Sequence, residues 1–169
     1  MPSLDAKTRT KRHTLDVSFI NPFLNAVIEV LRTMAMTEAQ PGKPFIKEGN
    51  MARGDVTGLI AVTGYSKGSF ALSFPESCAR GIISAMLGGE ELAPYGNDVR
   101  DGVGELTNMI AGLARRDLAH LGMKFHASVP EVLMGPEHRV EHLAKGPVLS
   151  IPFTCPCGDL VVEVCLDIT

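Results

Sequence analysis

The sequence has few of the features that mark nucleic-acid-binding, secreted and membrane proteins. Its 169 residues include no tryptophan and two tyrosines, which leaves little aromatic surface for stacking on bases. Lys and Arg number 16 against 19 Asp and Glu, and the resulting net charge of −3 gives no support for binding a phosphate backbone. No apolar run approaches the roughly 20 residues that span a bilayer, and no apolar signal segment lies near the N-terminus. We therefore expect a cytoplasmic globular protein without nucleic-acid or membrane partners.

The N-terminal residues differ in composition from the rest of the chain. They hold a basic cluster that consists of Lys7, Arg9, Lys11, Arg12 and His13. Because chain termini are often poorly ordered, we expect residues 1–15 to form a flexible tail rather than a binding arm. The remaining residues 16–169 have the length of one domain with a sizeable core.

The cysteines lack the paired spacing that is typical of structural zinc sites. The chain has four of them, at Cys78, Cys155, Cys157 and Cys165. Without a secretion signal they are most simply reduced thiols, and Cys165 reads as an ordinary strand residue. Possible ligand sets are Cys155 and Cys157 with Cys165, or His138 with His142. Neither set has a recognised ligand spacing, so we expect no metal site.

Hydrophobic periodicity predicts three helices and five longer strands. The expected helices open at Asn21-Pro22, at Pro75-Glu76 and at about Asp98, and the third ends at Leu121. The expected strands are 56–63, 68–74, 124–134, 146–154 and 158–167, with a weaker strand within 45–51. The two halves share one order, a long amphipathic helix followed by a three-strand meander. We expect an α+β fold, with an antiparallel sheet and the long helices packed on one face.

The helix expected over 98–121 carries the strongest functional signal. At about 100° per residue, one side holds an apolar stripe formed by Val103, Leu106, Ile110, Leu113, Ala114 and Leu121. Glu105, Asn108 and Gly112 lie on the opposite side, where Glu105 and Asn108 are neighbours on one ridge. Asn and Gly lower helix propensity, so a face under no functional demand would favour other residues. The ridge is a candidate site, and a solvated polar face is the ordinary alternative.

The two side chains of this ridge suit a reaction at a phosphoryl group. A carboxamide such as that of Asn108 donates and accepts hydrogen bonds, so it is able to orient an attacking water, as a Gln does in GTPases. A carboxylate one turn away is able to bind a cation of a partner protein.

Four residues of the chain match a family signature. Asp101 is followed by Glu105 after four residues, by Asn108 after three more, and by Pro130 after a further 22. With this spacing the chain resembles the CheX/CheC/FliY phosphatases of bacterial chemotaxis, and CheX most closely. Other CheX-like stretches are 20–23, 56–64, 67–70, 84–89 and 104–109, so the resemblance covers roughly residues 16–169.

The resemblance implies a reaction and a role for each residue. Such proteins hydrolyse the aspartyl phosphate of a CheY-like response regulator, in chemotaxis or in another two-component pathway. Asn108 would orient the attacking water, and Glu105 would pair with the regulator's phosphate-site lysine. Asp101 would either complement the helix dipole, which we favour, or contact the regulator. The Mg²⁺ would belong to the regulator, and the chain would need no cofactor of its own.

Gly112 and Pro130 would shape the surroundings of this site. Gly112 would give clearance, either to the regulator's surface or to a neighbouring helix. Pro130 would form part of a strand edge near the site, because Pro is confined to edges and bulges. We assign no chemistry to either residue.

The resemblance also implies a homodimer with one active site per chain. CheC-like members carry the motif in both halves, whereas the first helix here offers Asn25 and Glu29, four apart and in the reverse order. The main alternative is a non-catalytic adaptor that binds a receiver domain or another signalling protein. A small-ligand or metal sensor is a third possibility, for which the sequence shows neither a buried polar pocket nor ordered cysteine ligands.

Overall fold

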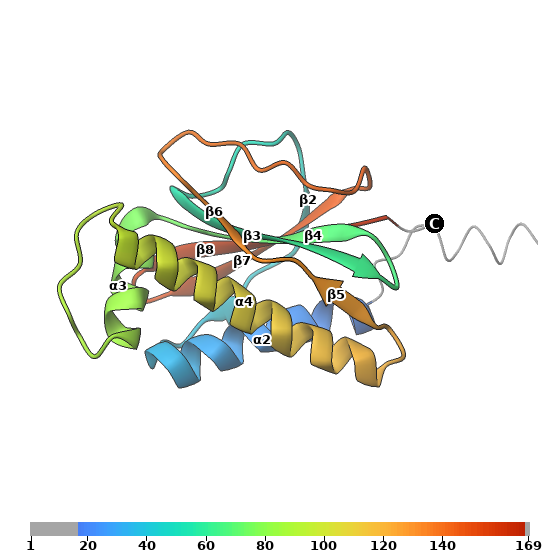
Figure 1. Ribbon diagram of the computed structural model, residues 1–169, viewed down its shortest axis with the longest axis horizontal. Helices are drawn as coiled ribbons and strands as arrows, with labels where there is room; N and C mark the ends of the chain where they lie inside the picture. The colour runs from blue at the N-terminus through green and yellow to red at the C-terminus, as the bar shows by residue number, and fades with distance from the viewer. Residues whose placement is uncertain (1–16, 168–169) are drawn as a thin grey trace, which may run out of the picture.

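The computed structural model describes residues 17–167, so the expected tail over 1–15 lies outside the described residues. An antiparallel sheet and three helices form the described part of the chain (Figure 1). The helices are α2 (Val17–Ala35), α3 (Glu76–Met86) and α4 (Asn97–His120). The longer strands are β3 (Val56–Gly64), β4 (Gly68–Phe74), β7 (Val148–Cys155) and β8 (Gly158–Leu166). The short strands are β1 (Gln40–Pro41), β2 (Phe45–Lys47), β5 (Phe125–Ala127) and β6 (Glu131–Met134).

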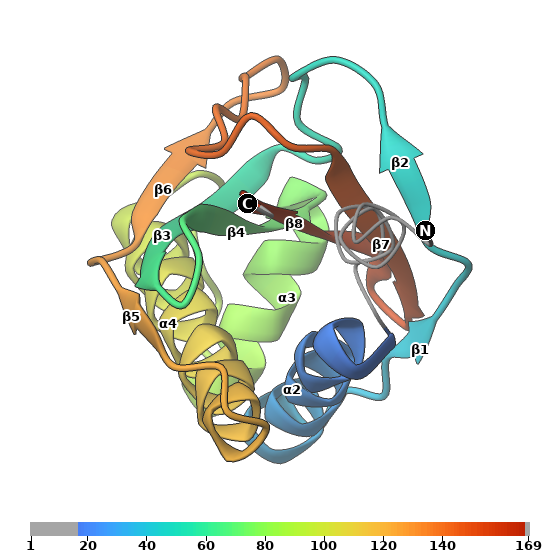
Figure 2. The ribbon, with the colours of Figure 1, turned by 90° about the vertical axis from the view of Figure 1, so that its right-hand side faces the viewer.

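The sheet has the strand order β1-β7-β8-β4-β3-β5. Strands β1 and β2 pair with different parts of the same edge of β7. In the same way, β5 and β6 pair with different parts of the same edge of β3. Every pair is antiparallel. Figure 2 shows the sheet curving around α2, α3 and α4, which lie together on its concave side. The expected α+β fold with helices on one face is therefore confirmed.

The three-strand meander expected within each half is not formed, because the first strand of each half pairs with a strand of the other half. Strand β2 joins β7 instead of β3, and the expected strand over 124–134 joins β3 instead of β7. That strand is also divided into β5 and β6. A short turn forces adjacent strands to pair, as it does between β3 and β4, but longer connections precede β3 and β7 and leave the pairing free.

The connection before β3 (residues 48–55) and the connection before β7 (residues 135–147) cover the other face of the sheet. Met51 forms a β-bridge with Arg139, and the Val140 backbone N–H donates to the carbonyl of Asn50. Strand β4 is buried along its whole length as a result, with α4 and Phe23 of α2 on one side and these connections on the other.

Helix α2 begins earlier than its sequence indicates. Asn21-Pro22 was expected to open the helix, but α2 starts at Val17 and contains Pro22. A proline lacks the N–H that bonds to a carbonyl four residues back, and this loss is smallest near the start of a helix. Pro22 and Phe23 are buried, and the Phe23 ring stacks on Phe70 with centroids 5.3 Å apart. Burial of this face offsets the lost hydrogen bond.

Helix α4 lies directly on strand β3. Four residues of the predicted apolar stripe are fully buried, namely Val103, Leu106, Ile110 and Ala114. Leu113 is half-buried, while Leu121 follows the last turn and is 55% exposed, so its place in the stripe was wrong. At Gly58 of β3, a Cβ would overlap the hydroxyl of Thr107, which donates to the Val103 carbonyl at 2.7 Å. Gly58 thus permits the close approach that sets the height of α4 above the sheet. Among the described helices, none is long and apolar enough to cross a bilayer.

Candidate functional site

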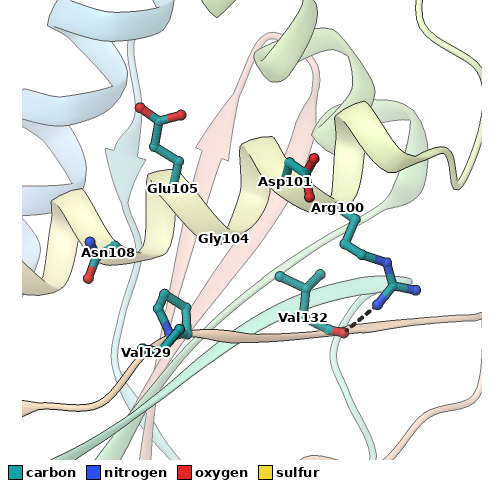
Figure 3. A pocket seen from close by; sticks show the side chains of 8 residues that line it. Arg100, Asp101, Gly104, Glu105, Asn108, Val129 and Val132 are labelled. Carbon is teal, nitrogen blue, oxygen red and sulfur yellow. Dashed lines mark hydrogen bonds between the residues drawn. The ribbon is translucent and has the colours of Figure 1, made fainter.

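A groove of about 560 Å³ runs between α4 and the edge of the sheet. One wall is the exposed face of α4, and the other is the segment that links β5 to β6 and the start of β6 (Figure 3). Its lining residues are Arg100, Asp101, Gly104, Glu105, Asn108, Val129, Pro130 and Val132. The groove therefore contains all four residues of the Asp-Glu-Asn-Pro signature, although Pro130 is distant from the others in the sequence.

Glu105 and Asn108 project from α4 one turn apart, as their helical spacing predicts. Both side chains are exposed, and neither has a hydrogen-bond partner among the described residues. Buried Leu106 and Thr107 lie between them in the sequence and fix this part of α4 on the sheet. The arrangement presents a carboxylate and a carboxamide to an incoming molecule with their hydrogen-bonding capacity unused.

The opposite wall is apolar and is broken by a proline. Pro130 lies between β5 and β6, where the strand pairing with β3 is interrupted, as expected for a proline at a sheet edge. Val129, directly before it, is 87% exposed and is labelled across from Asn108 in Figure 3. The groove therefore joins a polar ridge to an apolar rim.

Arg100 is a groove residue that the sequence did not single out. Its guanidinium nitrogen Nη1 donates to the Val132 carbonyl at 3.3 Å, which links the start of α4 to β6. No local pattern marks this arginine, because its partner lies 32 residues away and becomes a neighbour only through the sheet.

Asp101 and Gly112 lie where they are able to contact a partner. Asp98 is the acidic residue in the first turn of α4, while Asp101 falls in the second turn and lines the groove, a position that favours contact with a partner over the helix-dipole role. A Cβ at Gly112 would have nothing within 4 Å among the described residues. Clearance against a neighbouring helix of this chain is therefore not the reason for this glycine.

Comparison with known proteins gives the family. A family model described as chemotaxis phosphatase CheX matches residues 56–154, more than half of the chain. The chain belongs to the CheX family.

Relatives of this CheX-family chain agree along most of its length. It is 29% identical over 140 residues to the CheY-P phosphatase CheX of Thermotoga maritima, covering 83% of this chain and 89% of the relative. A crystal structure of CheX from Desulfovibrio desulfuricans is 40% identical, with a TM-score of 0.83 over 89% of this chain and 100% of the other. The CheX of a CheX–CheY–BeF3–Mg²⁺ complex from Borrelia burgdorferi has the same fold, with 24% identity and a TM-score of 0.73 over 89% of this chain and 99% of the other.

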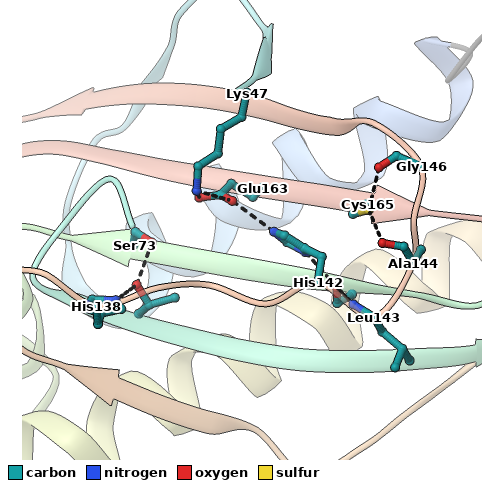
Figure 4. A network of polar contacts seen from close by, with 11 residues as sticks. Lys47, Ser73, His138, His142, Leu143, Ala144, Gly146, Glu163 and Cys165 are labelled. Carbon is teal, nitrogen blue, oxygen red and sulfur yellow. Dashed lines mark hydrogen bonds and ion pairs between the residues drawn. The ribbon is translucent and has the colours of Figure 1, made fainter. Parts of the chain in front are cut away.

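His138 and His142, which the sequence offers as possible ligands, are engaged in separate contacts on the outer face of the sheet (Figure 4). The ring nitrogens of His138 are hydrogen-bonded to Thr57 Oγ1 at 2.6 Å and to the Gly135 carbonyl at 2.8 Å. Those of His142 are hydrogen-bonded to Ser69 Oγ at 2.7 Å and to Glu163 at 3.0 Å. Since both nitrogens of each ring are used, the pair does not form a metal site.

Glu163 is the centre of a buried charge network. Its carboxylate accepts hydrogen bonds from Lys47 Nζ at 3.0 and 3.1 Å and from His142, and its side chain is fully buried. Burial acts to raise the pKa of Glu163, but hydrogen bonds from His142 and Lys47 and the charge of Lys47 outweigh it and hold this pKa below its usual range. The network ties β2 and the 135–147 connection to β8.

The chain of contacts Ser69–His142–Glu163 has the order of a hydrolytic triad but not its accessibility. Ser69 is 2% exposed, and its oxygen also accepts the Leu143 backbone N–H at 3.1 Å. A nucleophile must reach a substrate, so these contacts stabilise the fold and perform no chemistry.

The expectation of four reduced thiols was wrong, because Cys78 and Cys157 form a disulfide. Cys165, which one possible ligand set would join to Cys155 and Cys157, lies apart from both. Cys165 pairs with Val148 at one end of the β7–β8 hairpin, whereas Cys155 pairs with Gly158 at the other end. Cys165 is a buried strand residue, as expected, and its thiol donates to the Ala144 and Gly146 carbonyls. Sequence spacing could not reveal Cys78 as a neighbour, since it lies 79 residues from Cys157.

Proposed function

We propose that this chain removes the phosphoryl group from the aspartyl phosphate of a CheY-like response regulator. One observation carries the proposal: Glu105 and Asn108 lie side by side on α4, exposed and unpartnered among the described residues, and both line one groove. The family is described as a chemotaxis phosphatase, and the Thermotoga relative is named as a phosphatase of phosphorylated CheY. These descriptions support the same reaction.

In this proposal Asn108 acts by positioning a water molecule. Its amide oxygen accepts a hydrogen bond from the water while its NH₂ group donates to a phosphoryl oxygen. The water oxygen attacks phosphorus in line with the bond to the aspartate, which leaves as a carboxylate, and inorganic phosphate is released. No nucleophile is required from this chain, so catalysis is a matter of orientation.

Glu105 acts as the binding partner of a regulator lysine. The two side chains form an intermolecular ion pair that keeps Asn108 in register with the phosphoryl group. Mg²⁺ belongs to the regulator in this scheme. The Borrelia complex, which holds CheX, CheY, BeF3 and Mg²⁺ together, is consistent with that assignment. This chain supplies no cofactor of its own.

Asp101 and Gly112 extend the same contact surface along α4. Asp101 reaches the regulator from the groove, and the open space beside Gly112 admits the regulator's surface. We further propose one site per chain, because the exposed ridge lies on α4 while α2 offers only Asn25 and Glu29 in the reverse order. We also propose that the chain is a cytoplasmic homodimer, as the resemblance to CheX implies. Light scattering on the purified full chain tests the dimer.

The decisive experiment follows the decay of a phosphorylated CheY-type regulator with Mg²⁺, alone, with the wild-type chain, and with Asn108→Ala. Faster decay with the wild type only is the expected result. Unchanged decay together with measurable binding would replace the phosphatase with an adaptor that binds a receiver domain or another signalling protein.

A further inference from the structure

Three cysteines from two distant segments meet at one end of the sheet. Cys78 lies in the first turn of α3, Cys155 ends β7, and Cys157 lies in the turn to β8. Their sulfur atoms all lie within 4.8 Å of one another. Cys155 Sγ is 3.1 Å from Cys157 Sγ and 3.8 Å from Cys78 Sγ. The disulfide between Cys78 and Cys157 leaves Cys155 as a third, free thiol directly beside it.

A structural disulfide uses two sulfurs and gives no reason for a third at contact distance. A reducing environment converts the disulfide into two thiols, and the same place then holds three. From this juxtaposition of Cys78, Cys155 and Cys157, we propose that the reduced cluster binds one monovalent copper ion through three thiolates.

The ligand set favours Cu(I) among the common metal ions. Thiolates are soft ligands that select Cu(I) and zinc over hard cations. Structural zinc takes four protein ligands, and no further His, Cys, Asp or Glu joins this group among the described residues. Two sulfurs that each lie about 2.3 Å from one ion are no more than about 4.6 Å apart, and both separations of Cys155 meet this limit.

The surroundings of the cluster suit a shielded ion. Cys78 is fully buried and Cys155 is 8% exposed, while half-buried Cys157 gives a route from solvent. The Cys157 backbone is hydrogen-bonded to the Cys155 sulfur, while the protonated Cys155 thiol donates to the Gly158 carbonyl at 3.0 Å, a contact that ends when the thiol gives up its proton to bind copper. Gly158, with φ at +138°, forms the turn that brings Cys157 against the start of α3. The Cys157 backbone contact and this turn orient the sulfurs, as outer contacts do in metal sites.

Formation of the site balances in two steps. A dithiol or phosphine reductant gives two electrons to the Cys78–Cys157 bond, is itself oxidised, and two protons complete the thiols. Cu⁺ then forms three Cu–S bonds and displaces the three thiol protons into solvent. The site is independent of the groove on α4, so its test uses no phosphatase assay.

The test titrates the full chain with Cu(I) after phosphine reduction, without oxygen, in competition with the chromophoric chelator bicinchoninate. We expect one ion per chain, and X-ray absorption should show three sulfur ligands without nitrogen or oxygen. Cys155→Ser, which keeps the disulfide pair, should bind Cu(I) more than about a hundredfold more weakly, because even outer contacts of a metal site contribute 10–100-fold. Cys78→Ser should do the same. Cys165→Ser, at the other end of the hairpin, is the matched control and should bind like the wild type.

Several results would overturn the proposal. These are a chain that leaves all copper on the chelator, an affinity that Cys155→Ser does not change, a Cys78–Cys157 disulfide that persists in excess reductant, or Zn²⁺ held as tightly with a fourth ligand. Should Cys78→Ser fail to fold, the Cys155→Ser titration and the wild-type absorption spectrum still decide the matter.

Discussion

Two polar clusters on opposite sides of the sheet show what burial does to the same kinds of side chain. On α4, the Glu105 carboxylate and the Asn108 amide are exposed and have no hydrogen-bond partner among the described residues. On the outer face, the Glu163 carboxylate is fully buried and accepts hydrogen bonds from Lys47 and His142. The first cluster has free capacity for a partner, and the second has used its capacity within the chain.

Burial decides whether a polar cluster of this chain contributes to stability or to binding. A buried charge is tolerated only when it is paired, so removing one member of the Glu163 network leaves another uncompensated. An exposed side chain without partners contributes little to folding and is available for recognition. Substitutions in one cluster should therefore change stability alone, and substitutions in the other should change activity alone.

The largest expected effect on stability is that of Glu163→Gln. The substitution keeps the shape of the side chain but leaves Lys47 buried without a counter-charge, and it should lower the free energy of unfolding by about 3–5 kcal/mol. Urea unfolding of the full chain measures this. Glu105→Gln, the same change at an exposed position, is the matched control and should leave the unfolding midpoint unchanged. Equal midpoints for Glu163→Gln and the wild type would show that the buried Glu163 network does not stabilise the fold.

The pH dependence of unfolding sharpens the role of Glu163. The pKa of this carboxyl is lower in the folded chain than in the unfolded chain, where it is about 4.3. Its contribution to stability is therefore complete above that unfolded pKa and is lost as the pH falls through the folded pKa. The wild type should lose stability below about pH 4.3, and Glu163→Gln should lose less over the same range. Parallel curves for the two proteins would contradict this assignment.

The largest expected effect on activity is that of Asn108→Ala. Without the amide, the water is no longer held in line with the phosphorus, and the rate of dephosphorylation at saturating chain should fall at least about a hundredfold. Binding to the phosphorylated regulator and the unfolding midpoint should both stay near the wild-type values. Asn25→Ala on α2 removes an exposed amide outside the groove and should keep full activity. A fully active Asn108→Ala would exclude the proposed mechanism.

Gly58→Ala should lower stability and activity together, because it changes the position of the site through the core. The added Cβ would overlap the Thr107 hydroxyl and push α4 away from β3, which moves Glu105 and Asn108 with it. Overpacking of this kind costs about 1–3 kcal/mol in stability, and the phosphatase rate should fall as well. Thr107→Ala in the same chain removes the nearest atom and should restore part of both losses. The double-mutant cycle, measured by urea unfolding and phosphate release, tests the coupling. Additive effects would mean that this contact does not position the helix.

The ridge on α4 was predictable from sequence because helical periodicity is local. The spacing of Glu105, Asn108 and the apolar stripe fixes their relative directions on any helix, and the structure places Glu105 and Asn108 as expected. The fold class followed from the same periodicity. The distant Pro130 entered only through the family signature, and its place opposite α4 depends on the pairing of β5 and β6 with β3.

Contacts between distant segments could not be predicted from the sequence, because periodicity describes only neighbouring residues. Lys47 and Glu163 are separated by 116 residues, and each alone reads as an ordinary charged residue in a strand. The pairing of β2 with β7 brings them together, and the local pattern favoured β2 beside β3 instead. The Gly58–Thr107 contact and the meeting of Cys78 with Cys157 likewise depend on tertiary packing that no local spacing encodes.

The smallest expected effect is that of Glu105→Ala, and it tests the binding half of the α4 ridge. An exposed ion pair contributes about 1 kcal/mol or less, so affinity for the phosphorylated regulator should weaken by up to about fivefold while the rate at saturation changes little. Titration of this chain against the phosphorylated regulator measures both quantities together. Glu29→Ala on α2 removes an exposed carboxylate of the same type outside the groove and should change neither. Because ion pairs between exposed groups are screened by salt, the difference between Glu105→Ala and the wild type should shrink as ionic strength rises. A difference that is constant with salt, or a loss confined to the saturated rate, would place Glu105 at the phosphoryl group rather than opposite a lysine.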